Sequence, residues 1–375
     1  MTRVLHLIPT LDQGGAEKAL LTLATAPSRE QHRIVTMSGG AMMPELLAGG
    51  GDCRDLNLGR GGRSLAALPH RVMQAVSDYR PDVIHAWMYH AGIIAGILRI
   101  RLPIVIGVRQ CLDSNAGLRP RTRFVIRALA PITRRAAAIV YPSERARVQH
   151  EQIGYSKQRP FIIPNGFNGD VFRPDARKRA EMRSALGIAE GDLVLGHIAR
   201  FHAVKNQLSL VRSFASVARS RSAVRLLMAG QGLDGDNPAL TDEISRSGLP
   251  RDRFLLLGAR SDIPRLLPAL DGFALPSLSE AFPNSLAEAM HVGLVGIASN
   301  VGDVREMLGP NGFLIPPGDD LALCSAIQRW ADLERDDRQK MGLDAREAAL
   351  ARYSLERFSA NHSKMYQLIL GRAED

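Results

Sequence analysis

Residues 272–290 read GFALPSLSEAFPNSLAEAM, a short apolar run followed by a loop and then a helical pattern. The run GFALP has the length and composition of a buried strand, and in the helical part Leu286 and Met290 lie four residues apart on one face. A strand that passes directly into a helix is the repeating unit of a parallel α/β sheet. The stretch therefore predicts an α/β fold. It also raises the question of why Glu280 and Glu288 stand on either side of the Phe-Pro-Asn turn.

The same alternation of strand-like and helical stretches continues through the whole chain. In the first half we expect strands at RVLHLI, RIVTM, DVIHA, PIVIGV, AAIVY and FIIP. In the second half we expect them at LVLGHIA, VRLLMA, FLLLG, GFALP, GIAS and GFLIP. Helical candidates between these runs predict parallel strands joined by right-handed crossovers, as in Rossmann-like sheets.

A segment rich in Pro, Gly and Asn, residues 162–175, has the composition of a hinge between domains. We therefore expect two Rossmann-like domains, residues 1–165 and 166–353, followed by a C-terminal helix within residues 354–375. Ligands of such sheets bind at the carboxyl ends of the strands, so the loops that follow strands are the candidates for a functional site.

Composition excludes several classes of protein. The chain has 375 residues, of which 45% are hydrophobic and 23% charged, as expected for a soluble globular protein. No apolar run approaches the ~20 residues that span a bilayer, and the N-terminus shows no signal-peptide pattern. Cys53, Cys111 and Cys324 are scattered and lack CxxC spacing, which predicts reduced thiols in the cytoplasm and no zinc site.

Positive charge is concentrated in the first half of the chain. The net charge is +10, and the excess lies within residues 1–165, most densely in residues 118–149, where arginines alternate with apolar residues. Such a surface favours phosphates in lipid headgroups, nucleic acid or a diphosphate-linked substrate. Aromatic residues make up only 5% and no nucleic-acid motif is present, so we favour a lipid surface. A general preference for arginine would explain the residue type but not its uneven distribution.

Two loops could bind phosphate. In PTLDQGGAEKAL, residues 9–20, Gly14 and Gly15 allow close backbone approach at a helix N-terminus, although a Gly-Gly pair is as often only a tight turn. The GxGxxG spacing of a dinucleotide site is absent. In GHIARFHAVKNQ, Arg200 and Lys205 could clamp a diphosphate, or they could be an exposed basic pair.

Two further sets of residues could bind a sugar or an acceptor. Glu280 in its loop and Glu288 on its helix, away from the core face, could accept bonds from diol hydroxyls, or both could be solvated. His85, His90 and Arg109 follow strands of the first domain and would face a cleft, although a lone histidine is more often a core residue. No third ligand lies near the two histidines, so we expect no metal.

Taken together and in order, these loops resemble retaining glycosyltransferase family 4, which has the GT-B fold of two facing Rossmann-like domains. The matching segments are GGAEKALLTLA, IPNGFNGDVFRPD, GHIARFHAVKNQ, LLMAGQG, LLLGARSDIPRLLPALDGFALPSLSEAFPNSLAEAM and NGFLIPPGD. The final helical stretch, YSLERFSANHSKMYQLI, resembles the tail that crosses back to the first domain in this family. The most specific element is the pair of glutamates eight residues apart in its PSLSE context.

The resemblance implies a role for each candidate residue. Glu280 would contact the donor sugar, and Glu288 the ribose of a nucleotide-diphosphate sugar. Arg200 and Lys205 would hold the diphosphate and stabilise it as the leaving group. The other donor-binding residues would be Gly14, Gly15, Ala281, Phe282, Pro283, Asn284 and Ser285. The family transfers sugars with retention, by a route in which the leaving phosphate takes the acceptor proton, so neither a metal nor another cofactor is expected.

The chain departs from the family pattern at three places. Ala281 replaces a usual glycine, and Val295 replaces a usual proline. Arg109-Gln110 stands where many members have a histidine after the strand PIVIGV, so histidine-assisted handling of the acceptor lacks its usual residue. His85 or His90 is the candidate replacement.

The sequence therefore predicts a hexosyl-type glycosyltransferase that uses a nucleotide-diphosphate sugar and a lipid-linked saccharide acceptor in bacterial envelope polysaccharide synthesis. We expect a cytoplasmic protein that attaches peripherally to the inner face of the membrane and binds no nucleic acid. The alternatives are a sugar-nucleotide epimerase of GT-B fold and a non-catalytic module that binds nucleotide or membrane. The base, the sugar, the acceptor, the linkage and the oligomeric state stay open.

Overall fold

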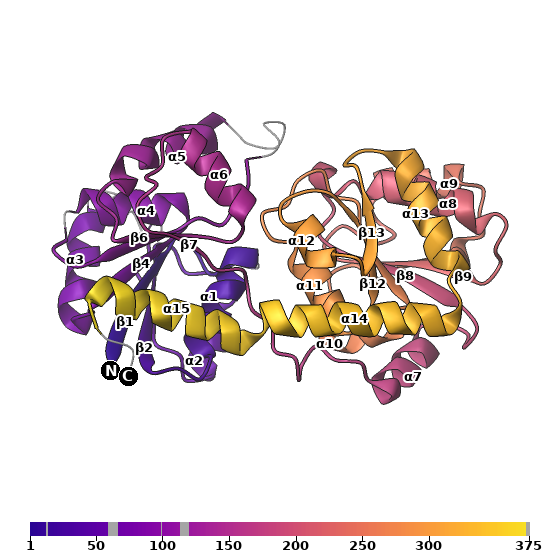
Figure 1. Cartoon of the computed structure of the whole chain (residues 1–375), viewed down its shortest axis with the longest axis horizontal. Coiled ribbons are helices and arrows are strands. Elements are labelled where there is room, and N and C mark those ends of the chain that lie inside the picture. The colour runs from indigo at the N-terminus through magenta and orange to yellow at the C-terminus, as the bar shows by residue number, and fades with distance from the viewer. Residues whose placement is uncertain (13, 59–66, 99, 113–119, 373–375) are drawn as a thin grey trace. The chain divides into compact units, whose positions relative to one another are not determined.

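The computed structural model describes residues 1–12, 14–58, 67–98, 100–112 and 120–372. The chain forms two compact units, the first from Met1–Gly166 with Leu355–Asp375 and the second from Phe167–Ser354. Each unit contains one parallel sheet with helices on both faces (Figure 1). The chain passes from the first unit to the second within the Pro-, Gly- and Asn-rich segment 162–175.

The first unit has a seven-stranded sheet in the order β3-β2-β1-β4-β5-β6-β7. Its strands are β1 (Thr2–Ile8), β2 (Glu30–Thr36), β3 (Cys53–Asp55), β4 (Val83–Trp87), β5 (Ile104–Gly107), β6 (Ala138–Tyr141) and β7 (Pro160–Ile162). Its helices are α1 (Gly15–Thr25), α2 (Met43–Ala48), α3 (Leu68–Tyr79), α4 (Met88–Ile97), α5 (Pro120–Thr133), α6 (Glu144–Gln152) and α15 (Leu355–Leu370).

The second unit has a six-stranded sheet in the order β10-β9-β8-β11-β12-β13. Its strands are β8 (Leu193–Ile198), β9 (Val224–Ala229), β10 (Phe254–Leu256), β11 (Gly272–Leu275), β12 (Val295–Ser299) and β13 (Gly312–Ile315). Its α-helices are α7 (Ala176–Ala185), α8 (Gln207–Ala218), α9 (Pro238–Arg246), α10 (Ile263–Leu266), α11 (Asn284–His291), α12 (Val304–Leu308), α13 (Asp320–Asp332) and α14 (Arg335–Tyr353). Three short 3₁₀ helices complete it: η3 (Ala203–Lys205), η4 (Arg251–Arg253) and η5 (Leu267–Ala269).

Both sheets reverse their strand order at one place. The order runs outward in one direction from β1 and in the other from β4, and the same reversal separates β8 from β11. The connections on the two sides of such a reversal leave the sheet toward opposite faces, which opens a crevice at the carboxyl ends of the two central strands. The loops after β8 and β11 are therefore the ones that the topology favours for ligand binding in the second unit.

Strands of the second unit supply two separate cores because they are buried on both faces. In β9, Leu226 and Met228 pack with α8, α9 and α13, while Leu227 and Ala229 pack on the opposite side with α7, α11, α12 and α14. Figure 1 shows these two helix layers on either side of the sheet. This explains why the strands read as continuous apolar runs and not as an alternation of apolar and polar residues.

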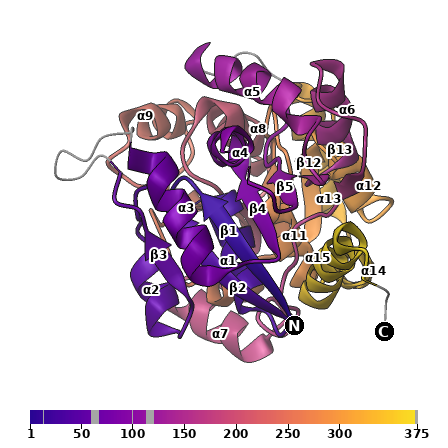
Figure 2. The ribbon, with the colours of Figure 1, turned by 90° about the vertical axis from the view of Figure 1, so that its left-hand side faces the viewer.

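The first unit is layered in the same way. In β1, Val4 and Ile8 pack with α1 and α15, while Leu5 and Leu7 pack with α3 and α4 on the other face. Figure 2 shows α3 and α15 on opposite sides of this sheet. The last helix is thus part of the core of the first unit, to which it contributes Phe358, Met365 and Tyr366.

All twelve strands expected from the sequence are present. The sequence reading missed β3, a three-residue edge strand whose residues Cys53–Asp55 are only partly buried and carry no apolar run. Among the described helices, none is both long and apolar enough to cross a membrane.

One glycine determines how closely two loops of the second unit approach. Gly230, directly after β9, has φ +145°, and a Cβ atom there would overlap the carbonyl oxygen of Ala199, directly after β8. Its N–H donates to the carbonyl oxygen of Gly258 at 2.7 Å. The loop that carries Arg200 and Lys205 therefore has its course set partly by the absence of a side chain at residue 230.

We predict that Gly230→Ala lowers the free energy of unfolding of the second unit by about 2–3 kcal/mol, because it combines backbone strain with a steric overlap. Gly191→Ala is the matched control, since a Cβ atom there meets nothing within 4 Å. Hydrogen-exchange mass spectrometry on peptides of β8 and β9 would measure the difference. Equal protection in the two variants would contradict this account of the loop.

Candidate active site

The second unit holds a charged pair at the reversal of its strand order. Lys205, the last residue of η3, follows β8, and Glu280 follows β11. Lys205 Nζ lies 2.5 Å from Glu280 Oε1, and Ser277 Oγ donates to the same oxygen at 2.7 Å. The two charged side chains are only 24% and 9% exposed. The sequence predicted both residues at strand ends, and the structure brings them into direct contact.

Backbone contacts hold the two loops together. The N–H of Leu278 donates to the carbonyl oxygen of Val204 at 2.7 Å, which links the loop after β11 to η3. His202 caps η3, since its Nδ1 accepts from the N–H of Val204 at 3.2 Å. Because β8 and β11 are neighbouring strands, these short links are enough to fix the lysine beside the carboxylate.

A buried polar chain supports the loop after β8. His197 Nδ1 bonds the carbonyl oxygen of Ala274 in β11, and its Nε2 faces Gln207 Nε2 at 3.3 Å. Gln207 in turn donates to the carbonyl oxygen of Arg200 at 2.9 Å. Burial lowers the pKa of His197 to about 4, so its ring is neutral at physiological pH. The sequence reading missed this chain, although Gln207 directly follows the loop and opens α8.

Arg200 lies at the start of the same loop. Its side chain is exposed and forms no ion pair with any residue in the described ranges. It is thus available to an incoming anion, while its backbone is fixed by Gln207. The structure does not bring its guanidinium into the Lys205–Glu280 contact.

The turn before α11 carries the other predicted donor-binding residues of the second unit. Pro283 stands just before the helix, and no side-chain hydrogen bond caps the helix. The N–H of Asn284 donates to the carbonyl oxygen of Phe282 at 3.0 Å, so this group is already engaged within the turn. Phe282 is buried and packs on Phe167 and Tyr353. Ala281 and Ser285 are partly exposed.

Glu288 lies on a different face of α11 from the core residues. Leu286 and Met290 are fully buried on the core face of α11, while Glu288 is only partly buried on another face of the helix. Its carboxylate therefore lies on a side of α11 that does not enter the apolar core.

In the first unit, Gly14 precedes α1 and Gly15 begins it, close to the predicted helix start. Gly14 has an extended backbone, and its own N–H donates to the carbonyl oxygen of Asp12 at 3.0 Å. Glu17 lies buried in the first turn of α1, where burial and, less strongly, Asp12 raise its pKa. Two acidic residues thus flank the proposed anion cradle, which weakens its attraction for phosphate.

The placement of His85 after a strand was wrong. His85 lies inside β4 and is fully buried, and its Nδ1 is 2.8 Å from the hydroxyl of Tyr366 on α15. It belongs to a histidine cluster with His6, His32 and His362, in which Trp87 donates to His6 Nδ1 at 3.0 Å. His85 therefore serves the core of the first unit in this structure. The expected strand DVIHA already included His85, so its side chain was wrongly assigned to the loop that follows the strand.

His90 and Arg109 have different environments. His90 is exposed on α4. Arg109 follows β5. Its Cζ lies over the Trp87 ring, 4.1 Å from the ring centre, and its Nη1 donates to Asn165 Oδ1 at 3.0 Å. Burial lowers the pKa of Arg109 to about 9, and its Nε and Nη2 have no partner among the residues that the structure describes. His85 and Arg109 thus both contact Trp87, whereas His90 is exposed on α4.

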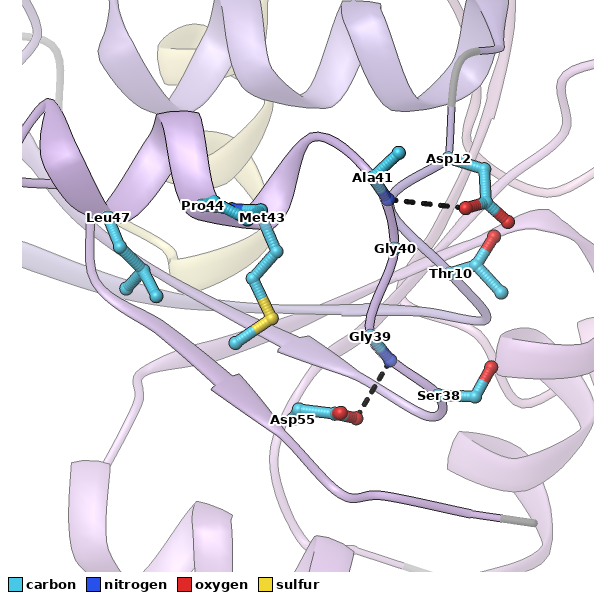
Figure 3. Close-up of a pocket in the computed structure, with 10 residues that line it drawn as sticks. All are labelled: Thr10, Asp12, Ser38, Gly39, Gly40, Ala41, Met43, Pro44, Leu47 and Asp55. Atoms are coloured by element: carbon cyan, nitrogen blue, oxygen red, sulfur yellow. Dashed lines mark hydrogen bonds between the residues drawn. The ribbon is translucent and has the colours of Figure 1, made fainter. Parts of the chain in front are cut away.

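The sequence reading also missed a pocket of about 630 Å³ at the carboxyl ends of β1, β2 and β3 (Figure 3). It is lined by Thr10, Asp12, Ser38, Gly39, Gly40, Ala41, Met43, Pro44, Leu47 and Asp55. A signal was present, since Ser-Gly-Gly follows the predicted strand RIVTM, as a ligand-binding turn would.

Comparison with known families assigns both units. Residues 13–171 match the family described as Glycosyltransferase Family 4, and residues 192–332 match Glycosyl transferases group 1. The chain belongs to glycosyltransferase family 4. Together the two matches cover most of this glycosyltransferase, and they include the loops that carry Lys205 and Glu280.

Relatives and solved structures agree with this assignment. A Bacillus subtilis (strain 168) protein whose name assigns it as a glycosyltransferase, EpsF, is 29% identical over 88% of this chain and 86% of its own. The Escherichia coli UDP-Gal:alpha-D-GlcNAc-diphosphoundecaprenol alpha-1,3-galactosyltransferase is 24% identical over 75% of this chain and 73% of its own. Anabaena Alr3699/HepE in complex with UDP and glucose has a TM-score of 0.86 at 23% identity, covering 98% of this chain and 100% of that one. The glycosyltransferase therefore has the GT-B fold.

The histidine cluster leads to a prediction on acid stability. Burial lowers the pKa of His362 to about 3 and holds those of His6 and His85 well below their usual value. Between pH 6.5 and these values only the unfolded chain binds the protons, so stability falls as pH falls. From pH 7.5 to 5.5 each of the three would cost the first unit about 1.4 kcal/mol.

Urea unfolding across this pH range would measure the loss. His362→Gln should reduce by about one the number of protons that the protein takes up on unfolding. The same change at exposed His90 should leave the slope of the unfolding free energy against pH unchanged. A flat stability profile between pH 7.5 and 5.5 would contradict burial of neutral histidines.

Proposed function

We propose that this glycosyltransferase transfers a sugar, with retention of configuration, from a nucleotide-diphosphate sugar to a lipid-linked saccharide in bacterial envelope polysaccharide synthesis. The observation that carries the proposal is the contact of Lys205 with Glu280 at the strand-order reversal of the second unit. It joins a cation suited to a diphosphate with a carboxylate suited to sugar hydroxyls.

Each member of the pair keeps bonding capacity for a substrate. Glu280 Oε1 accepts from both Lys205 and Ser277, while its Oε2 has no hydrogen-bond partner among the described residues and can accept from a hydroxyl. The ammonium of Lys205 has three N–H donors, of which this contact uses one. Lys205 can therefore donate to a diphosphate oxygen and still position Glu280.

This arrangement supports transfer by stabilisation of the leaving group. The bond between the anomeric carbon and the diphosphate oxygen breaks as the acceptor oxygen bonds to the same face of that carbon. The departing phosphate takes the acceptor proton, and Lys205 and exposed Arg200 offset its growing negative charge. Glu280 holds the sugar, and Glu288 on α11 is assigned the ribose.

The names of similar proteins support the substrate classes. The Anabaena structure contains UDP and glucose, and the Escherichia coli relative is named for UDP-Gal and a diphosphoundecaprenol acceptor. We therefore propose a UDP-hexose as donor and a lipid diphosphate carrying a sugar as acceptor, without a metal ion or other cofactor.

Helix α5 supports attachment to the inner face of the cytoplasmic membrane. Its buried side is formed by Ile126 and Leu129, while Phe124 is 74% exposed. Exposed arginines lie along the same helix and just beyond its end: Arg121, Arg123, Arg127, Arg134 and Arg135. An exposed aromatic ring among arginines suits an anionic lipid interface, where the ring enters the headgroup region.

Substitution of the charged pair tests the function. We expect UDP to raise the melting temperature of the protein, and Lys205→Met to abolish most of that rise. We expect Lys205→Met and Glu280→Gln to lower kcat for transfer by roughly 10²–10³, because each removes a fixed polar contact to the reacting groups. NMR of the product's anomeric proton would determine its configuration.

Glu181→Gln, at an exposed ion pair of α7, is the matched control and should keep full activity. Full transfer by Glu280→Gln would overturn the assigned site. Conversion of the donor to an epimer without acceptor would identify an epimerase, and nucleotide binding without turnover would identify a non-catalytic module.

Flotation with vesicles of phosphatidylglycerol and phosphatidylcholine tests the membrane surface. We expect binding that weakens from 50 to 500 mM salt, and a loss of roughly tenfold in Phe124→Ala. Leu321→Ala, which removes an 85% exposed apolar residue from α13, should bind like the wild type. Equal binding by Phe124→Ala would exclude α5 as the membrane surface.

A further inference from the structure

The pocket at the carboxyl ends of β1, β2 and β3 lies outside the Lys205–Glu280 site and within the first unit alone. Its volume of about 630 Å³ is within the ~300–1,000 Å³ common for small-molecule sites. Thr10 and Asp12 come from the loop after β1, Ser38 from the loop after β2, and Met43 from α2, as Figure 3 shows.

The walls of this pocket are held by backbone hydrogen bonds before any ligand arrives. The N–H of Leu11 donates to the carbonyl oxygen of Gly39 at 2.8 Å, and the N–H of Met42 donates to that of Leu11 at 2.9 Å. Gly40 has φ +146°, and a Cβ atom there would overlap the backbone of Leu11. The described residues of the loops after β1 and β2 are thus linked into one wall by these contacts.

Several polar groups on this wall remain available. Asp55 Oδ1 accepts from the N–H groups of Gly39 and Asn57, both at 2.8 Å, so this carboxylate is largely committed to the loop. Asp12 uses Oδ1 for the N–H of Ala41 at 3.3 Å, which leaves Oδ2 unbonded. Within the described part of the chain, the hydroxyls of Thr10 and Ser38 form no hydrogen bond. Two hydroxyls and a carboxylate oxygen therefore border the pocket.

The charge of the lining selects among ligands. Of the ten described residues that line the pocket, two are aspartates and none is lysine or arginine. A phosphate or carboxylate would meet like charge there without a cation to offset it. A neutral sugar instead donates its hydroxyls to carboxylate and hydroxyl oxygens. Its C–H face can pack on the apolar side chains of Met43 and Leu47, which Figure 3 shows on the opposite side of the pocket from Asp12.

We propose that this pocket binds the terminal sugar of the acceptor and selects an uncharged one, with Asp12, Thr10 and Ser38 binding its hydroxyls. This inference rests on the proposed function, which requires an acceptor sugar beside the donor diphosphate. Asp12 lies two residues before Gly14, in the loop assigned to the donor phosphates.

Saturation-transfer NMR on the full chain tests the pocket without a donor. The probes are neutral methyl glycosides of glucose, galactose and N-acetylglucosamine, compared with glucose 1-phosphate and glucuronate at equal concentration. We expect saturation transfer to at least one neutral glycoside, and a roughly tenfold loss of affinity in Asp12→Asn, because a bond to a charged group is removed. Ala41→Trp should abolish binding by filling the pocket.

Asp78→Asn is the matched control, since Asp78 lies on α3 in an exposed ion pair with Arg54 and should bind as the wild type does. Preferred binding of the two anionic probes, or binding that Asp12→Asn and Ala41→Trp leave unchanged, would overturn the inference. Absence of binding by every neutral glycoside would do the same.

The melting-temperature shift with UDP distinguishes failure of the pocket inference from failure of the proposed function. A protein that responds to UDP through Lys205 but binds no neutral glycoside would retain the donor site and lose the acceptor pocket. In transfer assays, Asp12→Asn should raise KM for the acceptor and leave KM for the donor unchanged. A variant affected only in kcat would contradict a binding role for Asp12.

Discussion

The reversal of strand order between β8 and β11 is the constraint on which the candidate active site depends. It directs two loops from neighbouring strands into one crevice, so that Lys205 and Glu280 meet although 75 residues separate them. Taking either charge out of water alone would be costly, and their contact together with Ser277 offsets that cost. The pair is complete within the second unit, so its assembly does not require the first unit. The hydrogen-bonded chain of His197 and Gln207 also fixes the loop after β8, because Gln207 donates to the backbone carbonyl oxygen of Arg200.

The first unit has the same strand order but uses its central strands differently. Where the second unit places a charged pair, β1 and β4 contribute His6, His85 and Trp87 to a buried aromatic cluster. Helix α15 closes this cluster with His362 and Tyr366. Tyr366 of the C-terminal helix gives His85 Nδ1 its hydrogen-bond partner, while His85 Nε2 has none among the described residues. Similar topology thus leads to a polar site in one unit and to an internal network in the other.

The net charge of +10 conceals two surfaces of opposite character within the first unit. The exposed side of α5 carries arginines around Phe124, whereas the pocket beside β1, β2 and β3 is bordered by Asp12 and Asp55. Under the proposed function this separation matches a lipid diphosphate acceptor, which combines an anionic, membrane-bound part with a neutral sugar. The arginines suit the lipid surface, and the pocket suits the sugar. A uniformly basic unit would attract the anionic part but could not distinguish a neutral sugar from a sugar phosphate.

Sequence alone determined the local elements and their order, because a strand buried on both faces reads as a continuous apolar run and a helix repeats its apolar residues every three or four positions. The run GFALP and the helix with Leu286 and Met290 were correct for this reason. The identification of glycosyltransferase family 4 was also correct, but it rested on the resemblance of several motifs and not on periodicity. Pairing between distant loops was decided only by the tertiary structure. No local pattern records that Lys205 touches Glu280, that His85 turns toward Tyr366, or that the loops after β1 and β2 enclose a pocket. Such contacts depend on strand order and on which face each side chain occupies, and both are set by packing across the whole sheet.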